Sequence, residues 1–269
     1  MPLNIAILGV SGRMGQTLVR EISLDRRLEL TGGIVRSDSE YADCDLGEMA
    51  GIGYLGRKSV VRLEDGAEGA DVMIDVSLPD ATIAAAKRLA KQGAPAMVTG
   101  VTGLTEGQSA ELAEAAKSLP ILVAGNFSVG VTILEDLVRQ AAAALPFHRW
   151  DTEIIETHHR AKLDAPSGTA LLLGEAVAEA RGQALDQVAS RGRDGHTGYR
   201  PPGTIGFAAV RGGSVIGEHE VRFLSDFEEI TLTHAARDRR VFALGALDAA
   251  RWINGKPAGL YTMRDMIAA

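Results

Sequence analysis

A basic segment, residues 156–170, holds the side chains best suited to proton transfer and to binding an anion. His158 and His159 can exchange protons near neutral pH, and Lys162 supplies a compact cation that stays charged. The sequence PSGT then leads into residues 170–180, whose apolar period predicts a helix. The first turn of such a helix has free N–H groups that bind a carboxylate or a phosphate. The segment therefore predicts a site for an anionic substrate.

Each of these residues also has a purely structural interpretation. His158 and His159 can finish a strand, Lys162 can be solvated, and Ser167 can be only a helix cap. Taken singly, each feature fits that interpretation. Their concentration within 15 residues favours a functional site instead.

The elements that must position this segment begin with an alternation of strands and helices. Short apolar runs and helical periods predict strands over 3–8, 28–35, 71–76, 96–99 and 121–124, and helices over 13–24, 81–91 and 106–118. Such alternation is typical of a parallel sheet with helices on both faces, an α/β fold. The glycine-rich residues 42–56 predict a surface excursion before the third strand.

The pattern changes after about residue 130, which predicts a second domain. The expected elements there are a helix over 131–144, a strand over 150–158 that leads to the basic segment, strands over 204–210, 214–223 and 228–234, and a terminal helix over 240–254. Gly212-Gly213 predicts a hairpin turn, and the terminal helix is expected to return to the first domain. The polar residues 183–203 are too long for a simple connection and predict a lid or a subunit arm, with a disordered loop as the alternative.

Composition limits the compartment and the partners. The 269 residues suffice for two modest domains, and a net charge of −7 with a pI of about 5.4 argues against nucleic acid and anionic membranes as partners. The single cysteine, Cys44, excludes an intramolecular disulfide and a zinc-cysteine site. Met1-Pro2 leads directly into a strand-like run, and no stretch of about 18 apolar residues occurs. We expect a soluble, cytoplasmic protein.

A glycine-rich turn follows the first predicted strand and opens the first helix, where a dinucleotide-binding turn is found. Its residues are Gly9, Val10, Ser11, Gly12, Arg13, Met14 and Gly15. The spacing is one residue longer than the commonest fingerprint, and a plain strand–helix turn is the alternative. The second strand ends in Arg36-Ser37 instead of an acidic residue, so Arg36 could hold a 2′-phosphate, which favours NADPH over NADH. A solvated Arg36 is the competing interpretation.

Two more glycine-bearing strand ends are expected at the carboxyl edge of the sheet, where open parallel folds bind ligands. The nicotinamide end of the cofactor is expected to rest against Gly100, Val101, Thr102, Ala124, Gly125, Asn126 and Phe127.

Six segments together resemble the 4-hydroxy-tetrahydrodipicolinate reductase family, also called the dihydrodipicolinate reductase family, of the bacterial and plant diaminopimelate route to lysine. They are residues 9–15, 99–103, 125–130, 156–170, 191–198 and 202–207, and the basic segment is the most specific of them. The likeness covers nearly the whole chain. It implies a Rossmann-like, doubly wound domain of residues 1–127 with 240–269. It also implies a second α+β domain with a mixed or antiparallel sheet, residues 128–239, that binds substrate and builds a homotetramer.

The resemblance also implies the reaction and the residues that perform it. Reduction by NADPH or NADH would follow loss of the 4-hydroxyl as water, with hydride added to a conjugated cyclic imine to give tetrahydrodipicolinate. His158 is like the family's proton donor or acceptor and Lys162 like its second donor. The substrate contacts resemble His159, Ser167, Gly168 and Thr169. We expect Lys162 and the first helical turn to hold a carboxylate of this cyclic dicarboxylate, while His158 or Lys162 delivers the proton.

The chain departs from the family pattern at three places near the cofactor. Arg36-Ser37 stands where relatives often have an acidic residue followed by arginine, Val101 replaces a threonine, and Leu78 stands where some relatives have arginine. NADPH is therefore the expected cofactor, with NADH as the alternative.

Three rival functions remain. A redox-sensing binding protein would need no acid and no substrate cation. A metal-dependent hydrolase built on His158, His159, His196, His219 and His234 lacks a recognised ligand spacing, so no metal is expected. A dehydrogenase of another small acid, of the aspartate or homoserine type, fits the basic segment less well than a cyclic dicarboxylate does.

Overall fold

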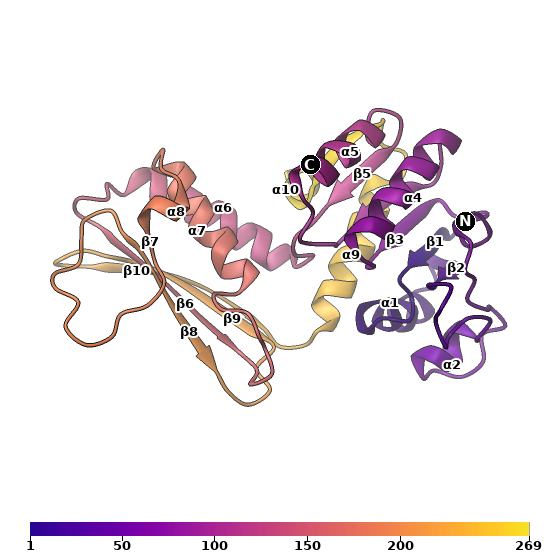
Figure 1. Cartoon of the computed structure of the whole chain (residues 1–269), viewed down its shortest axis with the longest axis horizontal. Helices are drawn as coiled ribbons and strands as arrows, with labels where there is room; N and C mark the ends of the chain where they lie inside the picture. The colour runs from indigo at the N-terminus through magenta and orange to yellow at the C-terminus, as the bar shows by residue number, and fades with distance from the viewer. Residues whose placement is uncertain (269) are drawn as a thin grey trace. The chain divides into compact units, whose positions relative to one another are not determined.

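The computed structural model describes residues 1–268, which form two compact units. The first unit contains residues 1–127 and the chain from residue 240 onward, and the second contains residues 128–239. Figure 1 labels the helices and strands of both units. The chain passes from one unit to the other after residue 127 and again after residue 239. None of the described helices is both long and apolar enough to span a membrane.

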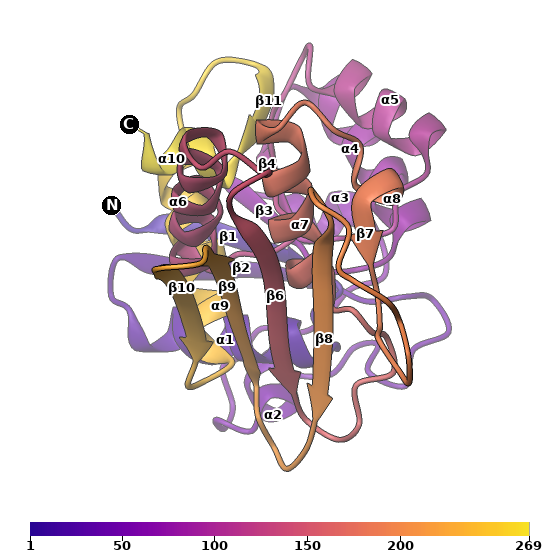
Figure 2. The ribbon, with the colours of Figure 1, turned by 90° about the vertical axis from the view of Figure 1, so that its left-hand side faces the viewer.

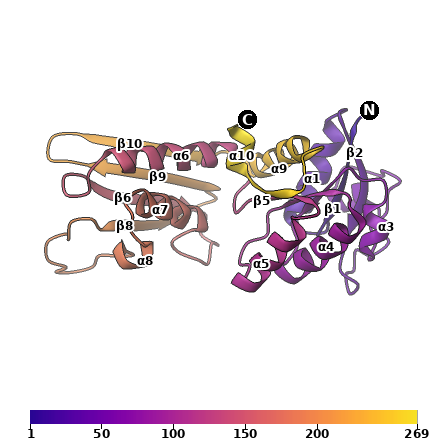
Figure 3. The same cartoon turned by 90° about the horizontal axis from the view of Figure 1, so that it is seen from above.

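The first unit is built on a six-stranded sheet whose paired strands are all parallel, in the order β11-β5-β4-β3-β1-β2. Its strands are β1 (Leu3–Leu8), β2 (Leu28–Ile34), β3 (Val72–Asp75), β4 (Ala96–Thr99), β5 (Pro120–Val123) and β11 (Gly259–Thr262). Its helices are α1 (Arg13–Leu24), α2 (Leu46–Ala50), α3 (Leu63–Ala67), α4 (Pro79–Gln92), α5 (Glu106–Ala115), α9 (Arg240–Ile253) and α10 (Met263–Ile267). Figure 3 shows α1 and α9 on one face of this sheet and α3, α4 and α5 on the other. The predicted doubly wound parallel sheet and the return of the terminal helix are confirmed.

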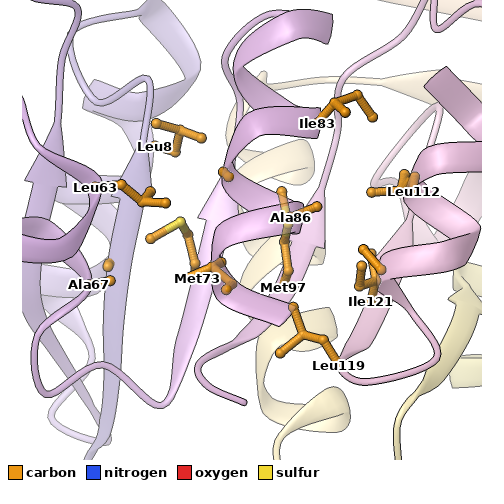
Figure 4. Packing of buried hydrophobic residues seen from close by; sticks show 14 of the residues in the cluster. Leu8, Leu63, Ala67, Met73, Ile83, Ala86, Met97, Leu112, Leu119 and Ile121 are labelled. Carbon is orange, nitrogen blue, oxygen red and sulfur yellow. The ribbon is translucent and has the colours of Figure 1, made fainter. Parts of the chain in front are cut away.

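The central strands of this sheet are apolar up to their last residues, Asp75 and Thr99, because helices cover both faces. Every residue of β3 and β4 is buried. Met73, Met97 and Ile121 pack against the α4 side chains Ala86 and Leu89 in a cluster seen in Figure 4. Each such fully buried large side chain contributes about 1.5–3 kcal/mol, which fixes the strand ends that carry the glycine-rich turns.

The expected surface excursion over residues 42–56 instead contains a capped helix. The carboxylate of Asp45 is buried and accepts hydrogen bonds from the backbone of Gly47, Glu48, Leu55 and Arg57. These bonds close the loop around the N-terminus of α2, which packs against α1. Asp45 three residues before Glu48 is a local helix-start signal, but the helix that it caps is only five residues long and shows no apolar period.

The second unit contains a mixed five-stranded sheet in the order β10-β9-β6-β8-β7. Its strands are β6 (Asp151–His158), β7 (Ala189–Ser190), β8 (Ile205–Arg211), β9 (Gly217–Leu224) and β10 (Glu229–Ala236). Its helices are α6 (Val129–Ala144), α7 (Gly168–Ala180) and α8 (Leu185–Val188). Figure 2 shows β6 between β9 and β8. Along β6 alternate side chains are buried, and α6 and α7 supply the apolar cluster around them.

The hairpin predicted at Gly212-Gly213 is wrong. β6 lies between β8 and β9, parallel to the first and antiparallel to the second, so the connection crosses the end of β6. Two backbone hydrogen bonds hold the crossing. The amide of Gly212 donates to the carbonyl of His158, and the amide of Arg160 donates to the carbonyl of Gly213. The glycine pair therefore lies beside the basic segment.

The polar residues 183–203 contain α8 and the short edge strand β7 before the chain returns to β8. Two arginines of this stretch, Arg193 and Arg200, bind the carboxylate of Glu153 on β6, with Nη2 of Arg193 at 2.8 Å and Nε of Arg200 at 3.0 Å. These ion pairs hold the stretch against the sheet.

Candidate active site

The glycine-rich turn between β1 and α1 brings backbone close to the start of the helix. Gly9 has φ +84°, a left-handed conformation that favours glycine. A Cβ on Gly15 would lie 2.5 Å from the carbonyl oxygen of Gly9, so only glycine permits this packing. Gly12 is the N-cap, and within the described chain no side chain caps the helix. The N–H groups of its first turn are therefore available to an anion such as a pyrophosphate.

A cavity of about 500 Å³ adjoins this turn at the end of β2. Gly9, Ser11, Gly12 and Arg36 line it, as the sequence analysis predicts for a cofactor site. The Arg36 side chain is 74% exposed, and its Nε lies 3.6 Å from Asp38. The described lining also includes Ser37 and Arg88 and contains no Asp or Glu, although the guanidinium of Arg88 is paired with Glu64 at 3.2 Å.

A second cavity, of about 400 Å³, lies at the ends of β3, β4 and β5 in the same unit. Eight residues predicted to bind cofactor line it, namely Met14, Gly100, Val101, Thr102, Ala124, Gly125, Asn126 and Phe127. A Cβ on Gly100 would lie 2.3 Å from the ring of Phe127, so glycine lets this ring close one side of the cavity. Ser77 and Leu78 line both cavities. The two cavities are therefore adjacent and share these lining residues.

Three predicted cofactor residues line neither cavity. The Val10 side chain is fully buried, Gly15 serves the close approach of α1 to the turn, and Arg13 is exposed at the start of the helix. The turn thus combines residues that shape the backbone with others that face the open space.

Asp75, which the sequence analysis did not select, joins the loops that line both cavities. Its buried carboxylate accepts hydrogen bonds from the hydroxyls of Thr82, at 2.6 Å, and Thr99, at 2.8 Å, and from the amide of Ser77, at 3.0 Å. Burial raises the pKa of Asp75 above its usual range, against the lowering effect of these hydrogen bonds. The group fixes the ends of β3 and β4 relative to each other.

His158, the predicted proton donor or acceptor, ends β6 on the face that α6 and α7 cover. It is 8% exposed. Its Nδ1 lies 2.6 Å from Oε2 of Glu156, two residues earlier on the same face of the strand. The Glu156 side chain is 1% exposed. A buried carboxylate therefore orients the imidazole.

Glu156 has two further partners besides His158. Arg211, at the end of β8, donates to both carboxylate oxygens at 2.7 Å, and the amide of Ser167 donates to Oε1 at 3.0 Å. Burial acts to raise the pKa of Glu156, but these bonds and the one from His158 outweigh it and hold that pKa below its usual range. The carboxylate is therefore ionised at neutral pH.

Ser167 and His219 form the next layer beneath the site. The Ser167 hydroxyl caps α7 by accepting from the amide of Ala170, and lies 3.0 Å from Nε2 of His219. Burial, reinforced by the neighbouring His158, lowers the pKa of His219 to about 4. His219 is thus neutral near pH 7 and packs edge-on against the ring of His158, with centroids 5.1 Å apart. The hydroxyl of Ser167, a predicted substrate contact, is occupied within the protein.

Lys162 lies in the loop between β6 and α7 and is paired with Asp164. Its Nζ is 2.9 Å and 3.0 Å from the two carboxylate oxygens, and this contact lowers the pKa of Asp164. Gly168, the first residue of α7, is exposed, and Thr169 and His159 are half-buried. The segment thus presents a cation and a helix N-terminus beside an oriented imidazole.

Glu156, Arg211 and His219 come from three different strands, and the sequence analysis assigned none of them to the site. One signal was available, because Glu156 and His158 are two residues apart in a predicted strand and must share a face. Strand pairing brings in the others: His158 pairs with Arg211 on β8, and Glu156 with His219 on β9. Among residues 1–268 no group of three or more His, Cys, Asp or Glu side chains is arranged to hold a metal ion.

Comparison with known proteins gives matches over both units. A family model described as dihydrodipicolinate reductase, N-terminus, matches residues 3–127, and one described as dihydrodipicolinate reductase, C-terminus, matches residues 130–267. The 4-hydroxy-tetrahydrodipicolinate reductase of Parvibaculum lavamentivorans is 49% identical over 266 residues, covering 98% of this chain and 97% of the relative. That of Caulobacter vibrioides is 46% identical over 267 residues, covering 99% and 97%. The solved structure of a dipicolinate-bound dihydrodipicolinate reductase from Paenisporosarcina sp. TG-14 is 25% identical with a TM-score of 0.76, covering 97% of this chain and 98% of the other.

Proposed function

The chain belongs to the dihydrodipicolinate reductase family, and from that membership we propose that it reduces 4-hydroxy-tetrahydrodipicolinate to tetrahydrodipicolinate in diaminopimelate and lysine biosynthesis. The observation that carries the proposal is the identity of nearly half of all residues to relatives of that name over 98% of the chain. The oriented imidazole beside a cation and a helix N-terminus supports it, because the reaction needs a proton and an anchor for a dicarboxylate.

The donor set of the first unit fits a dinucleotide. The uncapped first turn of α1 suits a pyrophosphate, and the cavity of about 400 Å³ at the strand ends suits the nicotinamide. When bound, the nicotinamide cofactor supplies the hydride. NADPH is the preferred form, because the cavity beside the end of β2 is lined by Arg36 and Ser37 and by no described acidic residue, and the exposed Arg36 can exchange Asp38 for a 2′-phosphate. An acid there would bind the ribose hydroxyls of NADH and repel a 2′-phosphate.

The second unit binds the substrate, a cyclic dicarboxylate. The dipicolinate bound by the Paenisporosarcina relative is a planar dicarboxylate, which supports this class of ligand. Lys162 and the first turn of α7 at Gly168 and Thr169 hold one carboxylate, and His159 contacts the same ligand. In the free protein Lys162 is paired with Asp164, and the substrate carboxylate takes the place of Asp164 when it binds. Ser167 supports the turn as the helix cap.

His158 supplies the proton that balances the hydride. The substrate loses its 4-hydroxyl as water, the conjugated imine gains a hydride and a proton, and tetrahydrodipicolinate leaves with its two carboxylates intact. Lys162 assists as a second proton donor. It lies in the loop that follows His158, and its ammonium group carries three N–H donors.

The protein acts as a cytoplasmic homotetramer assembled through the second unit. The exposed residues Ala208, Ala209 and Val210 of β8 and Ile230 of β10 offer apolar surface on that unit's sheet for contact between copies. Light scattering of the purified protein tests the tetramer by its mass.

The test of the function is a spectrophotometric assay. Given the fresh condensation product of aspartate semialdehyde and pyruvate, the purified protein should oxidise NADPH with loss of absorbance at about 340 nm. Omission of pyruvate is the control and should abolish the loss. An unchanged absorbance with the complete mixture would sink the proposal and favour a redox-sensing binding protein. Oxidation or reduction of nicotinamide with aspartate semialdehyde or homoserine alone would favour a dehydrogenase of small linear acids.

A further inference from the structure

We propose that Glu156 and Arg211 are positioning residues that together decide which nitrogen of His158 transfers the proton and over what range of pH. The inference rests on the proposed role of His158 in the reduction. It concerns two residues that do not themselves contact substrate: one carboxylate on β6 and one guanidinium on β8.

The geometry assigns the proton on Nδ1 of His158. Glu156 is ionised and can only accept hydrogen bonds, so the 2.6 Å contact from Nδ1 to Oε2 requires a proton on that nitrogen. Its oxygens are otherwise occupied by Arg211 and by the amide of Ser167, so the carboxylate has no freedom to turn away. The transferred proton must then belong to Nε2.

The strand beside His158 places a glycine, and so no side chain, against Nε2. A Cβ on Gly217, the first residue of β9, would lie 3.0 Å from Nε2, so any side chain there would crowd that nitrogen. The ring is thus held from its Nδ1 side by Glu156, and on its Nε2 side the neighbouring strand carries a glycine with no side chain to block that nitrogen. This arrangement suits exchange of one proton at one atom.

Arg211 controls how strongly Glu156 favours the protonated ring. A carboxylate close to a histidine stabilises the imidazolium and, alone, would keep the proton on the ring at the pH where it must be released. Arg211 neutralises the same carboxylate through two bonds of 2.7 Å and opposes that effect. The pair therefore orients the ring while the charge of the carboxylate is balanced by Arg211.

Other charged or titratable groups face His158 from the elements around it. They are Lys162 and Asp164 in the following loop, His219 on β9 and, beyond it, His234 on β10. Lys162 and Asp164 are paired with each other, and burial favours the neutral form of both His219 and His234. The N-terminus of α7 adds a partial positive charge near Ser167. Glu156 and Arg211 remain the full charges whose removal should change the pH dependence most.

The decisive experiment records kcat against pH for Glu156→Gln and Arg211→Met. If the rate requires protonated His158, activity falls as pH rises through a midpoint. Loss of the negative charge in Glu156→Gln should lower that midpoint by about 1 pH unit or more, and loss of the positive charge in Arg211→Met should raise it similarly. Glu156→Gln should also reduce kcat roughly 100-fold, because its amide would donate to Nδ1 and favour the wrong tautomer. Arg211→Lys keeps the charge and should hold the midpoint near that of the wild type.

Glu153→Gln is the matched control. Glu153 lies on the same strand and also binds two arginines, but no histidine. Its replacement removes a comparable ion pair and should leave the midpoint unchanged. Equal midpoints in all variants, or shifts in the same direction for Glu156→Gln and Arg211→Met, would overturn the inference.

A spectroscopic measurement keeps the inference testable if Glu156→Gln does not fold. In wild-type protein with nitrogen-15 histidine, the His158 signal, identified by its loss in His158→Gln, should show a neutral ring protonated on Nδ1. A neutral ring protonated on Nε2 would contradict the assignment. Because this readout needs no turnover, it separates failure of the inference from failure of the proposed reaction, which would appear as an inactive wild type.

Discussion

At the scale of single residues, two carboxylates of the basic segment are each paired with a cation. Lys162 is paired with Asp164, and Arg211 is paired with Glu156. A dicarboxylate can replace Asp164 at Lys162 because that carboxylate is 63% exposed, whereas Glu156 is buried and cannot be displaced by a ligand. The exposed pair is therefore suited to binding and the buried pair to positioning.

Replacing Lys162 with alanine should reduce kcat/KM by roughly 100-fold or more, because a charge-assisted contact and a proton donor are lost together. Affinity for NADPH, measured by fluorescence titration, should stay near wild type. Lys58→Ala is the matched control, since Lys58 forms a similar exposed pair with Asp43 at 2.9 Å in the first unit. Activity of Lys162→Ala equal to that of Lys58→Ala would refute the role of Lys162.

Arg36→Glu should weaken NADPH binding by roughly 10-fold or more and change NADH binding much less, because a carboxylate would repel only the 2′-phosphate. Dissociation constants for both cofactors check this. Arg57→Glu is the control, because Arg57 is an exposed arginine of the same unit that lines neither cavity. An equal loss of affinity for NADPH and NADH would show that Arg36 does not bind the 2′-phosphate.

At the scale of elements, the function depends on how strands end and helices begin. The turns after β1, β3, β4 and β5 line the two cavities of the first unit, and Asp75 ties two of these ends together. In the second unit, β6 ends at His158 and α7 begins at Gly168. Both ends are fixed by Glu156, which binds His158 and the amide of Ser167.

Gly15→Ala should lower both the unfolding free energy and the cofactor affinity. Its Cβ would lie 2.5 Å from backbone oxygens of Gly9 and Val10, and relief of that clash should cost about 1–3 kcal/mol and move α1 away from the turn. Gly107→Ala is the control: this glycine lies in α5, a Cβ there would meet nothing closer than 3.9 Å, and the change should stabilise by about 0.5–1 kcal/mol. Chemical denaturation with and without NADPH measures both effects, and a Gly15→Ala protein as stable as the wild type would contradict the close packing.

At this scale the sequence predicted an element correctly where a single continuous segment of the chain determines its structure. The alternating apolar runs predicted the parallel sheet, and the cap and period of residues 167–180 predicted α7. It failed where the partner is distant in sequence. Gly212-Gly213 has the composition of a hairpin turn, yet β6 occupies the space between the strands it connects. Residues 259–262 form the edge strand β11 because they pair with backbone N–H and C=O groups of β5 that have no other strand beside them.

At the scale of the whole molecule, acid stability reflects the buried groups of the site. His219 has its pKa lowered from 6.5 to about 4 by burial and by His158, so the fold favours the neutral ring. The unfolded chain takes up this proton as pH falls below 6.5, and stability is therefore lost between pH 6.5 and about 4. Glu156 and Asp45, whose pKa values are lowered, should add to the loss at still lower pH.

The stability of the wild type should thus fall by about 2 kcal/mol through His219 alone between pH 7 and pH 5. His219→Gln should remove this part of the pH dependence, which urea denaturation at the two pH values would measure. His148→Gln is the control, since that histidine is exposed in the turn between α6 and β6. An identical pH dependence in the wild type and His219→Gln would contradict the buried neutral state.

The composition of the molecule predicted its class and a size of two domains, and the basic segment predicts a substrate site that stays a prediction. The network beneath that segment could not be predicted from local pattern, because Glu156, Arg211 and His219 become neighbours only through the register of three strands. The family resemblance supplied the reaction, and the structure adds how the ring of His158, the proposed proton donor, is held by Glu156.

The most direct test of the account is the fate of hydrogen from C4 of the cofactor. With NADPH carrying deuterium in both C4 positions and 4-hydroxy-tetrahydrodipicolinate as substrate, mass spectrometry should find tetrahydrodipicolinate that carries a single deuterium, formed in step with NADP⁺. Product without deuterium, or NADPH oxidation without tetrahydrodipicolinate, would contradict the claim that this protein transfers hydride to the cyclic dicarboxylate.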